Sequence, residues 1–139
     1  MPDNRYPLMI NGMAVVSAPA EIDIANAEQL RTVLREARRR GHARVVVDMT
    51  RTRYCDSAGF SALVAAHKRA LAEGGGLRLI IPVGSRVLRI FTVIGLGRFI
   101  PRFASLEQAL NPGPAAASPP VPPRPSGGPR QPARPADGA

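Results

Sequence analysis

Hydrophobic and polar residues change their spacing along this chain, and the changes outline a strand followed by a helix. Residues 45–47 are three consecutive valines, and a short run of β-branched residues is typical of a strand buried on both faces. After a polar loop, apolar residues return at helical spacing: Phe60, Leu63, Val64 and Leu71. The pattern predicts a strand over about 44–49 and a helix over about 58–72.

The segments before this central strand predict a hairpin, a loop and a helix. Asn11-Gly12 lies between two apolar runs, and Asn-Gly in that setting is typical of a tight turn between antiparallel strands. Residues 20–24 are expected to form a loop. Asn26 with Gln29 three residues later resembles a capping box at a helix start. The positions that follow form one apolar helical stripe: Ala27, Leu30, Leu34 and Ala37.

The segments after the second helix predict a strand and a third helix. The glycines at 74–76 predict the end of the second helix, and the apolar run 77–81 predicts a strand. Ser85 is expected to cap a helix over about 86–94. This third helix is apolar on more than one face. The extra face is either a contact surface or part of the core, and we expect core packing on both sides.

The last elements complete an α/β pattern. Residues 98–100 predict a brief strand, and Ser105 with Gln108 predicts a capping box before a short last helix. Strands and helices alternate after residue 20. The sequence therefore predicts an α/β fold with a mixed central β-sheet covered by about four helices.

The composition changes sharply at residue 111. Residues 112–139 hold ten of the fifteen prolines and no Leu, Ile or Phe. Such a segment cannot bury enough apolar surface to offset the entropy of ordering the chain. We therefore predict a single domain over 1–111 and a disordered, proline-rich tail over 112–139.

The formal net charge of the chain is +9, which suggests nucleic-acid binding as one interpretation. The basic residues crowd most at one predicted helix end: Arg35, Arg38, Arg39 and Arg40. The helix dipole favours cations at that end, and no aromatic residues interleave with the arginines to stack bases. We therefore expect a solvated basic surface and no direct nucleic-acid binding.

Few residues are available for metal or redox chemistry. The single cysteine, Cys55, excludes an internal disulfide and a cysteine metal cluster, and it is either a small buried residue or an exposed thiol. His42 and His67 are too few for a zinc site on their own, and we predict no metal or cofactor. No apolar run has membrane-spanning length and no signal-peptide pattern opens the chain, so we expect a cytoplasmic protein without a membrane partner.

Ser57 lies where the loop meets the second helix, and we expect its side chain to be the N-cap. Asp56, just before it, is expected to stabilise the helix start through the helix dipole, a role that is compatible with partner docking. Gly59 is expected to leave the first helical turn uncrowded, so that a partner can reach the serine. On position alone, a structural cap is the simpler interpretation. Asp48 is expected to bind the backbone of the loop. No nucleophile–base pair or phosphate-binding glycine loop is recognisable, and we predict that the chain is not an enzyme.

An ordered set of motifs resembles a known protein family. Asp56-Ser57-x-Gly59, after Val-Val-Val-Asp-Met-Thr, is similar to the phosphorylation segment of bacterial anti-sigma factor antagonists, which are stand-alone STAS domains. Further segments match in the same order: Glu21-Ile22-Asp23, Ala70-x-x-x-Gly74-Gly75-x-Leu77-x-Leu79 and Gly95-Leu96. Tyr54-Cys55 and Phe60 depart from the family pattern beside the serine. The resemblance spans residues 8–110 and implies a STAS-like fold.

The resemblance also implies a phosphorylation switch at Ser57. In its unphosphorylated form the protein would bind an anti-sigma factor that is also a serine kinase, and a sigma factor would be released. Phosphorylation of Ser57 would separate the pair, and a serine phosphatase would reset the switch. The resemblance places Asp23, Thr50, Asp56 and Gly59 with Ser57 on the surface that faces the kinase.

A second function is compatible with the same resemblance. STAS domains also serve as non-catalytic subunits of larger machines, such as a lipid-transport ATPase or a stress-signalling assembly. In that alternative Ser57 need not be phosphorylated.

Overall fold

The computed structural model describes residues 8–111, and the predicted proline-rich tail, 112–139, lies outside the described residues. Within 8–111 the chain forms strands, four α-helices and one short 3₁₀-helix, η1. Their order is β1 (Leu8–Ile10), β2 (Met13–Ser17), β3 (Glu21–Ile22), α1 (Ala27–Arg40), β4 (Arg44–Asp48), β5 (Tyr54–Cys55), α2 (Ser57–Ala72), β6 (Gly76–Ile80), α3 (Arg86–Val93), η1 (Leu96–Arg98), β7 (Arg102–Phe103) and α4 (Leu106–Leu110).

The central sheet has the strand order β1-β2-β4-β6-β7. β1 is antiparallel to β2, and the other neighbouring strands are parallel, which confirms the mixed sheet. β4 lies in the middle, so both of its faces are covered, and Val45, Val46 and Val47 are at most 1% exposed. This position explains why its sequence is a continuous apolar run.

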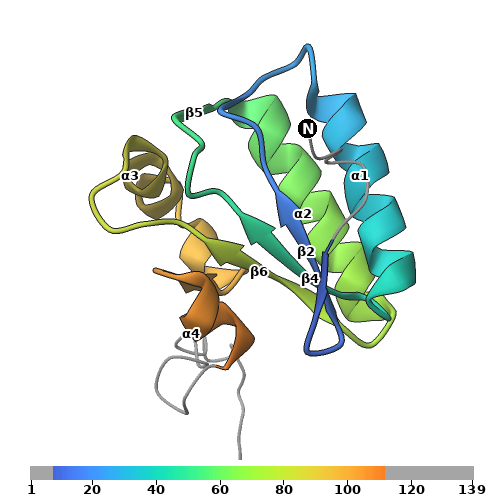
Figure 1. Ribbon diagram of the computed structural model, residues 1–139. Coiled ribbons are helices and arrows are strands. Elements are labelled where there is room, and N and C mark those ends of the chain that lie inside the picture. Colours follow the sequence, from blue (N-terminus) through green and yellow to red (C-terminus); the bar gives the residue numbers. More distant parts are fainter. Residues whose placement is uncertain (1–7, 112–139) are drawn as a thin grey trace, which may run out of the picture.

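Helices cover both faces of the sheet (Figure 1). α1 and α2 lie together on one face, and α4 covers part of the other. The larger core lies beneath α1 and α2 and also takes in Val87 and Phe91 of α3. A smaller core lies beneath α4: Met13, Val15, Val46, Ile80, Phe103 and Ala109.

The first two strands form the predicted hairpin. Ile10 pairs with Met13 across the turn, and the two turn residues have positive φ angles, 54° at Asn11 and 77° at Gly12. A two-residue turn of this kind needs left-handed backbone at both positions, which Asn and Gly adopt at least cost.

The predicted caps of the last two helices are confirmed. Ser85 Oγ accepts a hydrogen bond from the Leu88 N–H at 3.1 Å, and Ser105 Oγ accepts one from the Gln108 N–H at 3.2 Å. The Gln108 side chain reaches back to the N–H of Ala104 at 3.1 Å. These bonds satisfy backbone donors that have no partner within their own helix.

Two predictions about the segment before α1 are wrong. Residues 20–24 contain the strand β3, because Ile22 pairs with Cys55 of β5. Asn26 occupies the N-cap position of α1 but makes no side-chain capping bond. Its amide instead holds the preceding turn: Oδ1 accepts from the Asp23 N–H at 2.9 Å, and Nδ2 donates to the Glu21 carbonyl at 2.8 Å.

The brief strand predicted at 98–100 is also wrong. η1 occupies the start of this segment, and Ile100 is fully buried in the larger core, which explains its apolar character. The strand β7 begins only after Pro101, where Arg102 pairs with Leu79. Proline has no N–H to donate to a strand ladder, so a strand start is one of the few places that tolerate it.

Candidate functional site

The start of α2 is held by Asp56 and not by Ser57. Asp56 has extended backbone, and its Oδ1 accepts a hydrogen bond from the Gly59 N–H at 3.1 Å. Ser57 is the first residue of the helix and is exposed. The prediction that Ser57 is the N-cap is therefore wrong by one residue. The Ser57 hydroxyl therefore does not cap the helix.

Two backbone N–H groups at the start of α2, those of Ser57 and Ala58, are free within the part of the chain that the structure describes. The first N–H groups of a helix have no partner inside the helix. Asp56 takes the N–H of Gly59, whereas the N–H groups of Ser57 and Ala58 have no hydrogen-bond acceptor within the described residues. A negatively charged group attached to the Ser57 hydroxyl would therefore find two donors and the positive end of a helix dipole beside it.

The ribbon of β3 and β5 brings Asp23 next to Asp56. Ile22 pairs with Cys55 in parallel register, and the Asp56 N–H donates to the Ile22 carbonyl at 3.0 Å. The residues that follow this pair along the two strands are Asp23 and Asp56, so they lie side by side. Asp23 Oδ1 also accepts a hydrogen bond from the Ala25 N–H at 2.9 Å. Asp23 and Asp56 thus both follow the last paired residues of the ribbon, and Asp56 directly precedes Ser57.

Gly59 has a structural role that the sequence did not reveal. It is buried, and a Cβ added there would lie 2.6 Å from Ile22 Cγ2 and 2.7 Å from Cys55 Sγ. The first turn of α2 therefore packs directly onto the ribbon of β3 and β5. The expectation that the turn is uncrowded at Gly59 is wrong. Gly59 lets the first turn of α2, which carries Ser57, pack closely on the ribbon.

Thr50 lies after the central strand β4 and is exposed. The Asp48 carboxylate accepts hydrogen bonds from the Thr50 N–H, at 2.9 Å, and from the Thr50 hydroxyl. The prediction that Asp48 binds loop backbone is thus confirmed. Thr50 does not line the surface hollow beside Ser57 that is described next.

An apolar hollow of about 670 Å³ borders Ser57 between α2 and α3. Its lining is largely hydrophobic: Tyr54, Cys55, Phe60, Val64, Ala65, Ile90, Ile94 and Leu96, with Asp56, Ser57, Ser61 and Lys68 as the polar members. Asp23, Thr50 and Gly59 are not in the lining. Of the five predicted site residues, the structure brings Asp56 and Ser57 to this hollow.

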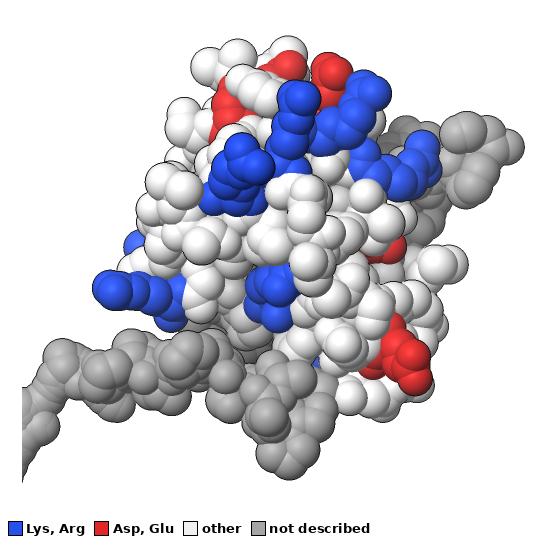
Figure 2. Space-filling model, turned by 90° about the vertical axis from the view of Figure 1, so that its left-hand side faces the viewer, with Lys and Arg blue, Asp and Glu red and all other residues white. Residues whose placement is uncertain are grey.

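The side chains of α3 that line or flank the hollow are exposed. Ile90 is 41% exposed and Val93 78%, and Ile94, which directly follows the helix, is 51% exposed. The prediction that α3 packs into the core on both sides is therefore wrong, because only Val87 and Phe91 of this helix are buried. On the α3 side of the molecule, uncharged surface lies between several basic side chains (Figure 2). Exposed apolar surface of this kind marks interaction sites.

Cys55 is a buried thiol beneath the hollow. It is 2% exposed, and burial, with the Asp56 carboxylate as the second cause, raises the pKa of the thiol to about 12. The thiolate is the reactive form of cysteine. Cys55 is therefore a packing residue, which answers the question that the sequence left open.

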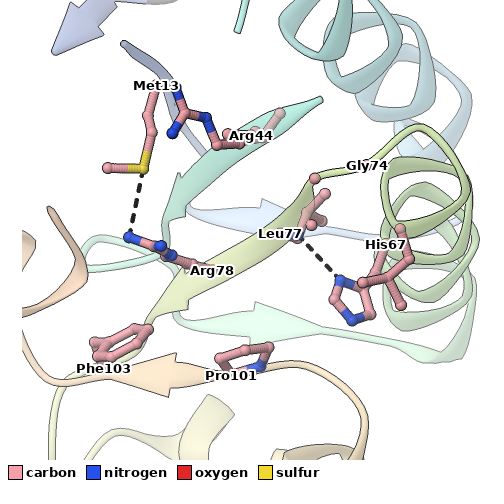
Figure 3. A pocket seen from close by; sticks show the side chains of 12 residues that line it. Met13, Arg44, His67, Gly74, Leu77, Arg78, Pro101 and Phe103 are labelled. Atoms are coloured by element: carbon pink, nitrogen blue, oxygen red, sulfur yellow. Dashed lines mark hydrogen bonds between the residues drawn. The ribbon is translucent and has the colours of Figure 1, made fainter. Parts of the chain in front are cut away.

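A different hollow, of about 300 Å³, lies at the edge of β6 (Figure 3). His67 of α2 is buried, and its Nδ1 accepts a hydrogen bond from the Leu77 N–H at 3.0 Å. On the other side, Arg78 Nη1 donates to the Ala109 carbonyl at 2.6 Å. His67 and Arg78 thus connect β6 to α2 and α4, and no predicted site residue lies in this hollow.

The described residues contain no helix that is both long and apolar enough to cross a membrane.

Comparisons with known proteins agree with this fold. The family model of the STAS domain matches residues 9–109. A Bordetella bronchiseptica protein named as an anti-sigma factor antagonist, BtrV, is 30% identical over 100 residues, which are 72% of this chain and 85% of that protein.

Solved structures show the same fold at lower identity. An anti-sigma factor antagonist from Mycobacterium paratuberculosis is similar with a TM-score of 0.67 and 23% identity, over 75% of this chain and 87% of that one. The Bacillus cell fate determinant SpoIIAA, in its phosphorylated form, is similar with a TM-score of 0.54 and 23% identity, over 74% and 92%. The chain belongs to the STAS domain family and has relatives named as anti-sigma factor antagonists.

Proposed function

We propose that this protein is an anti-sigma factor antagonist controlled by phosphorylation of Ser57. In the unphosphorylated form it binds an anti-sigma factor that is also a serine kinase, and a sigma factor is released. The observation that carries the proposal is the position of Ser57. It is the exposed first residue of α2, and it lies on the rim of an apolar hollow.

The hollow supplies the contact area for the kinase. Ile90 of α3, Ile94 directly after this helix and Tyr54 of β5 offer exposed apolar surface next to the serine. Aromatic and aliphatic side chains that become fully desolvated provide most of the affinity at protein interfaces. A kinase seated there has the Ser57 hydroxyl within reach of its nucleotide.

Phosphorylation changes the charge of this surface without unfolding the domain. The kinase transfers the γ-phosphoryl group of ATP to Ser57 Oγ, and the hydroxyl proton is released. The phosphate adds roughly −1.5 to −2 charge beside Asp56 and Asp23. The free N–H groups of Ser57 and Ala58 can bind the phosphate, so the fold tolerates it. The surface loses affinity because a dense negative charge must be desolvated on docking.

The rest of the cycle follows from this chemistry. A serine phosphatase hydrolyses the phosphoserine and restores binding. In this cycle the chain acts as a substrate and a binding module in the cytoplasm, without catalysis or a cofactor of its own. It contacts neither nucleic acid nor membrane.

A phosphorylation assay tests the assignment of the site. The purified anti-sigma factor and ATP are incubated with the wild type, Ser57→Ala and Ser61→Ala, and the phosphorylated residue is identified by mass spectrometry. Ser61 is the matched control, because it is exposed one helical turn further along α2 and lines the same hollow. We expect Ser57→Ala alone to block the reaction. Undiminished phosphorylation of Ser57→Ala would refute the site, and the absence of phosphorylation of the wild type would favour a STAS subunit of a larger assembly.

A further inference from the structure

A small hollow between α1 and α2 is lined mainly by arginines. Its volume is about 160 Å³. The lining consists of Arg31, Arg35 and Arg38 from α1, and Ala62, Ala65, Ala66 and Arg69 from α2. No carboxylate lines it, and none of the residues proposed above for the Ser57 switch contributes to it.

The two helices build this hollow in different ways. On α1, Arg31, Arg35 and Arg38 are spaced by four and three residues, so they lie on one face of the helix. Opposite them, α2 presents three alanines. Because alanine side chains are short, the space between the helices stays open, and the arginines form its walls.

Helix dipoles explain only part of this arrangement. They favour cations in the last turn of a helix, where Arg38 and Arg69 lie. Arg31 and Arg35 lie further back along α1, where the dipole gives no such preference. Within the described residues, Arg31, Arg35 and Arg69 form no ion pair with an acidic side chain.

Arg38 lies deepest in the cluster. It is only 9% exposed, and its Nε has no hydrogen-bond partner within the described residues. The nearest acid is Glu73, with Oε1 at 3.4 Å from Nε. Arg38 thus forms an ion pair with Glu73, but its Nε makes no hydrogen bond within the described residues, and a buried donor without a hydrogen bond is costly. Four guanidinium groups thus meet around one hollow with a single carboxylate at its margin.

We propose that this hollow binds an oligophosphate, an anion with two or more linked phosphate groups. The planar fork of arginine donors matches phosphate oxygens in a bidentate way. Four guanidinium groups with one nearby carboxylate carry a net positive charge, which a multivalent anion neutralises better than a monovalent one. No aromatic side chain lines the hollow to stack a base, so the phosphates are the recognised part. A free oligophosphate and the phosphate chain of a nucleotide share this chemistry. The proposal is independent of the Ser57 switch.

Calorimetric titration of the full-length protein tests the ligand class. Inorganic phosphate, tripolyphosphate and ATP are compared at fixed ionic strength. We expect tripolyphosphate and ATP to bind with similar affinity. Inorganic phosphate should bind at least about tenfold more weakly, because it engages fewer guanidinium groups. Binding of ATP without binding of tripolyphosphate would overturn the proposal, since the nucleoside would then be the recognised part. The absence of binding by both would also overturn it.

Matched double variants test the place of binding. Arg35→Ala with Arg69→Ala removes two exposed arginines of the hollow, and Arg86→Ala with Arg89→Ala removes two exposed arginines of α3. Both variants lose the same charge, and circular dichroism checks that both are folded. We expect the first variant to bind tripolyphosphate about tenfold more weakly and the second to bind almost as the wild type does. Equal losses would mean a response to net charge only and would overturn the site.

A third arm distinguishes a small anion from nucleic acid. A short labelled duplex DNA is titrated with the wild type and with both double variants. We expect weak binding that responds equally to the two variants, because it reflects net charge. Tight binding of the duplex that is lost only in Arg35→Ala with Arg69→Ala would overturn the small-anion proposal and assign the hollow to the nucleic-acid backbone.

Discussion

The Asp56 carboxylate accepts a hydrogen bond from the Gly59 N–H at 3.1 Å, so the aspartate caps α2 and leaves the neighbouring serine exposed. Capping and the proposed switching are thus carried out by two different, adjacent residues. Asp56 stabilises the helix start in every state of the protein, and Ser57 can change its chemistry without removing the cap.

Alanine substitutions separate these two roles. Asp56→Ala should lower the free energy of unfolding by about 1 kcal/mol, because it removes a side-chain cap. Ser57→Ala should change that free energy by less than about 0.5 kcal/mol, the scale of surface substitutions. Urea denaturation of the two variants measures both values. A larger loss for Ser57→Ala than for Asp56→Ala would mean that the serine is the cap after all.

The contact of α2 with the β3–β5 ribbon predicts that Gly59 tolerates no side chain. In Gly59→Ala the new methyl group would lie closer than 3 Å to Ile22 and Cys55, both of them buried. We expect a destabilisation of about 1–3 kcal/mol, typical of overpacking, although alanine is the better helix former. Urea denaturation measures it, with Ser61→Ala on the exposed face of α2 as the control. A stability equal to that of the wild type would show that the ribbon moves away easily.

The bond between His67 and Leu77 predicts a pH dependence of stability. Burial lowers the pKa of His67, and the backbone of Phe99 opposes this shift more weakly. The unfolded chain therefore binds the proton more readily than the folded one. The stabilising contribution is complete above the unfolded pKa of about 6.5 and is lost as the pH falls below it, since a protonated Nδ1 cannot accept the Leu77 N–H.

Denaturation curves at pH 8 and pH 5.5 measure this contribution. The wild type should lose stability between the two values, and His67→Gln, which cannot be protonated, should lose less. His42 is exposed, so His42→Asn serves as the control and should behave as the wild type. An identical loss in His67→Gln would assign the pH dependence to other groups.

The apolar hollow predicts a variant that is folded but binds weakly. Ile90→Glu places a charge on exposed α3 surface that must be desolvated when a partner docks. Val83→Glu adds the same charge at an exposed loop residue outside the lining of the hollow. We expect Ile90→Glu to weaken binding of the anti-sigma factor by about 1–3 kcal/mol and Val83→Glu to have little effect. Equal affinities of the two variants would place the docking surface elsewhere.

Much of the fold was predictable because local patterns and tertiary structure agree. The valine run 45–47 is buried in the middle of the sheet, and Asn11-Gly12 forms the expected turn. The cap of α2 was not predictable, because Asp56 and Ser57 are both good cap residues one position apart. What selects the aspartate is a tertiary contact, the bond of its N–H to the Ile22 carbonyl.

Other features depend on contacts that no local pattern encodes. The two-residue strands β3 and β5 are too short to show a period, and they form because Ile22 and Cys55 meet. The apolar character of α3 was visible in the sequence, but not which of its faces the core would cover. The spacing of Arg31, Arg35 and Arg38 was equally visible, whereas the approach of Arg69 from α2 was not.

The central claim is that a negative charge on Ser57 turns off binding to the anti-sigma factor. The most direct test is titration of that partner with the unphosphorylated wild type, Ser57→Asp and phospho-Ser57 protein at one salt concentration. We predict that Ser57→Asp binds about 1–3 kcal/mol more weakly than the wild type, and that the phosphoprotein, which carries more charge, binds more weakly still. Equal affinities of the three forms would contradict the account.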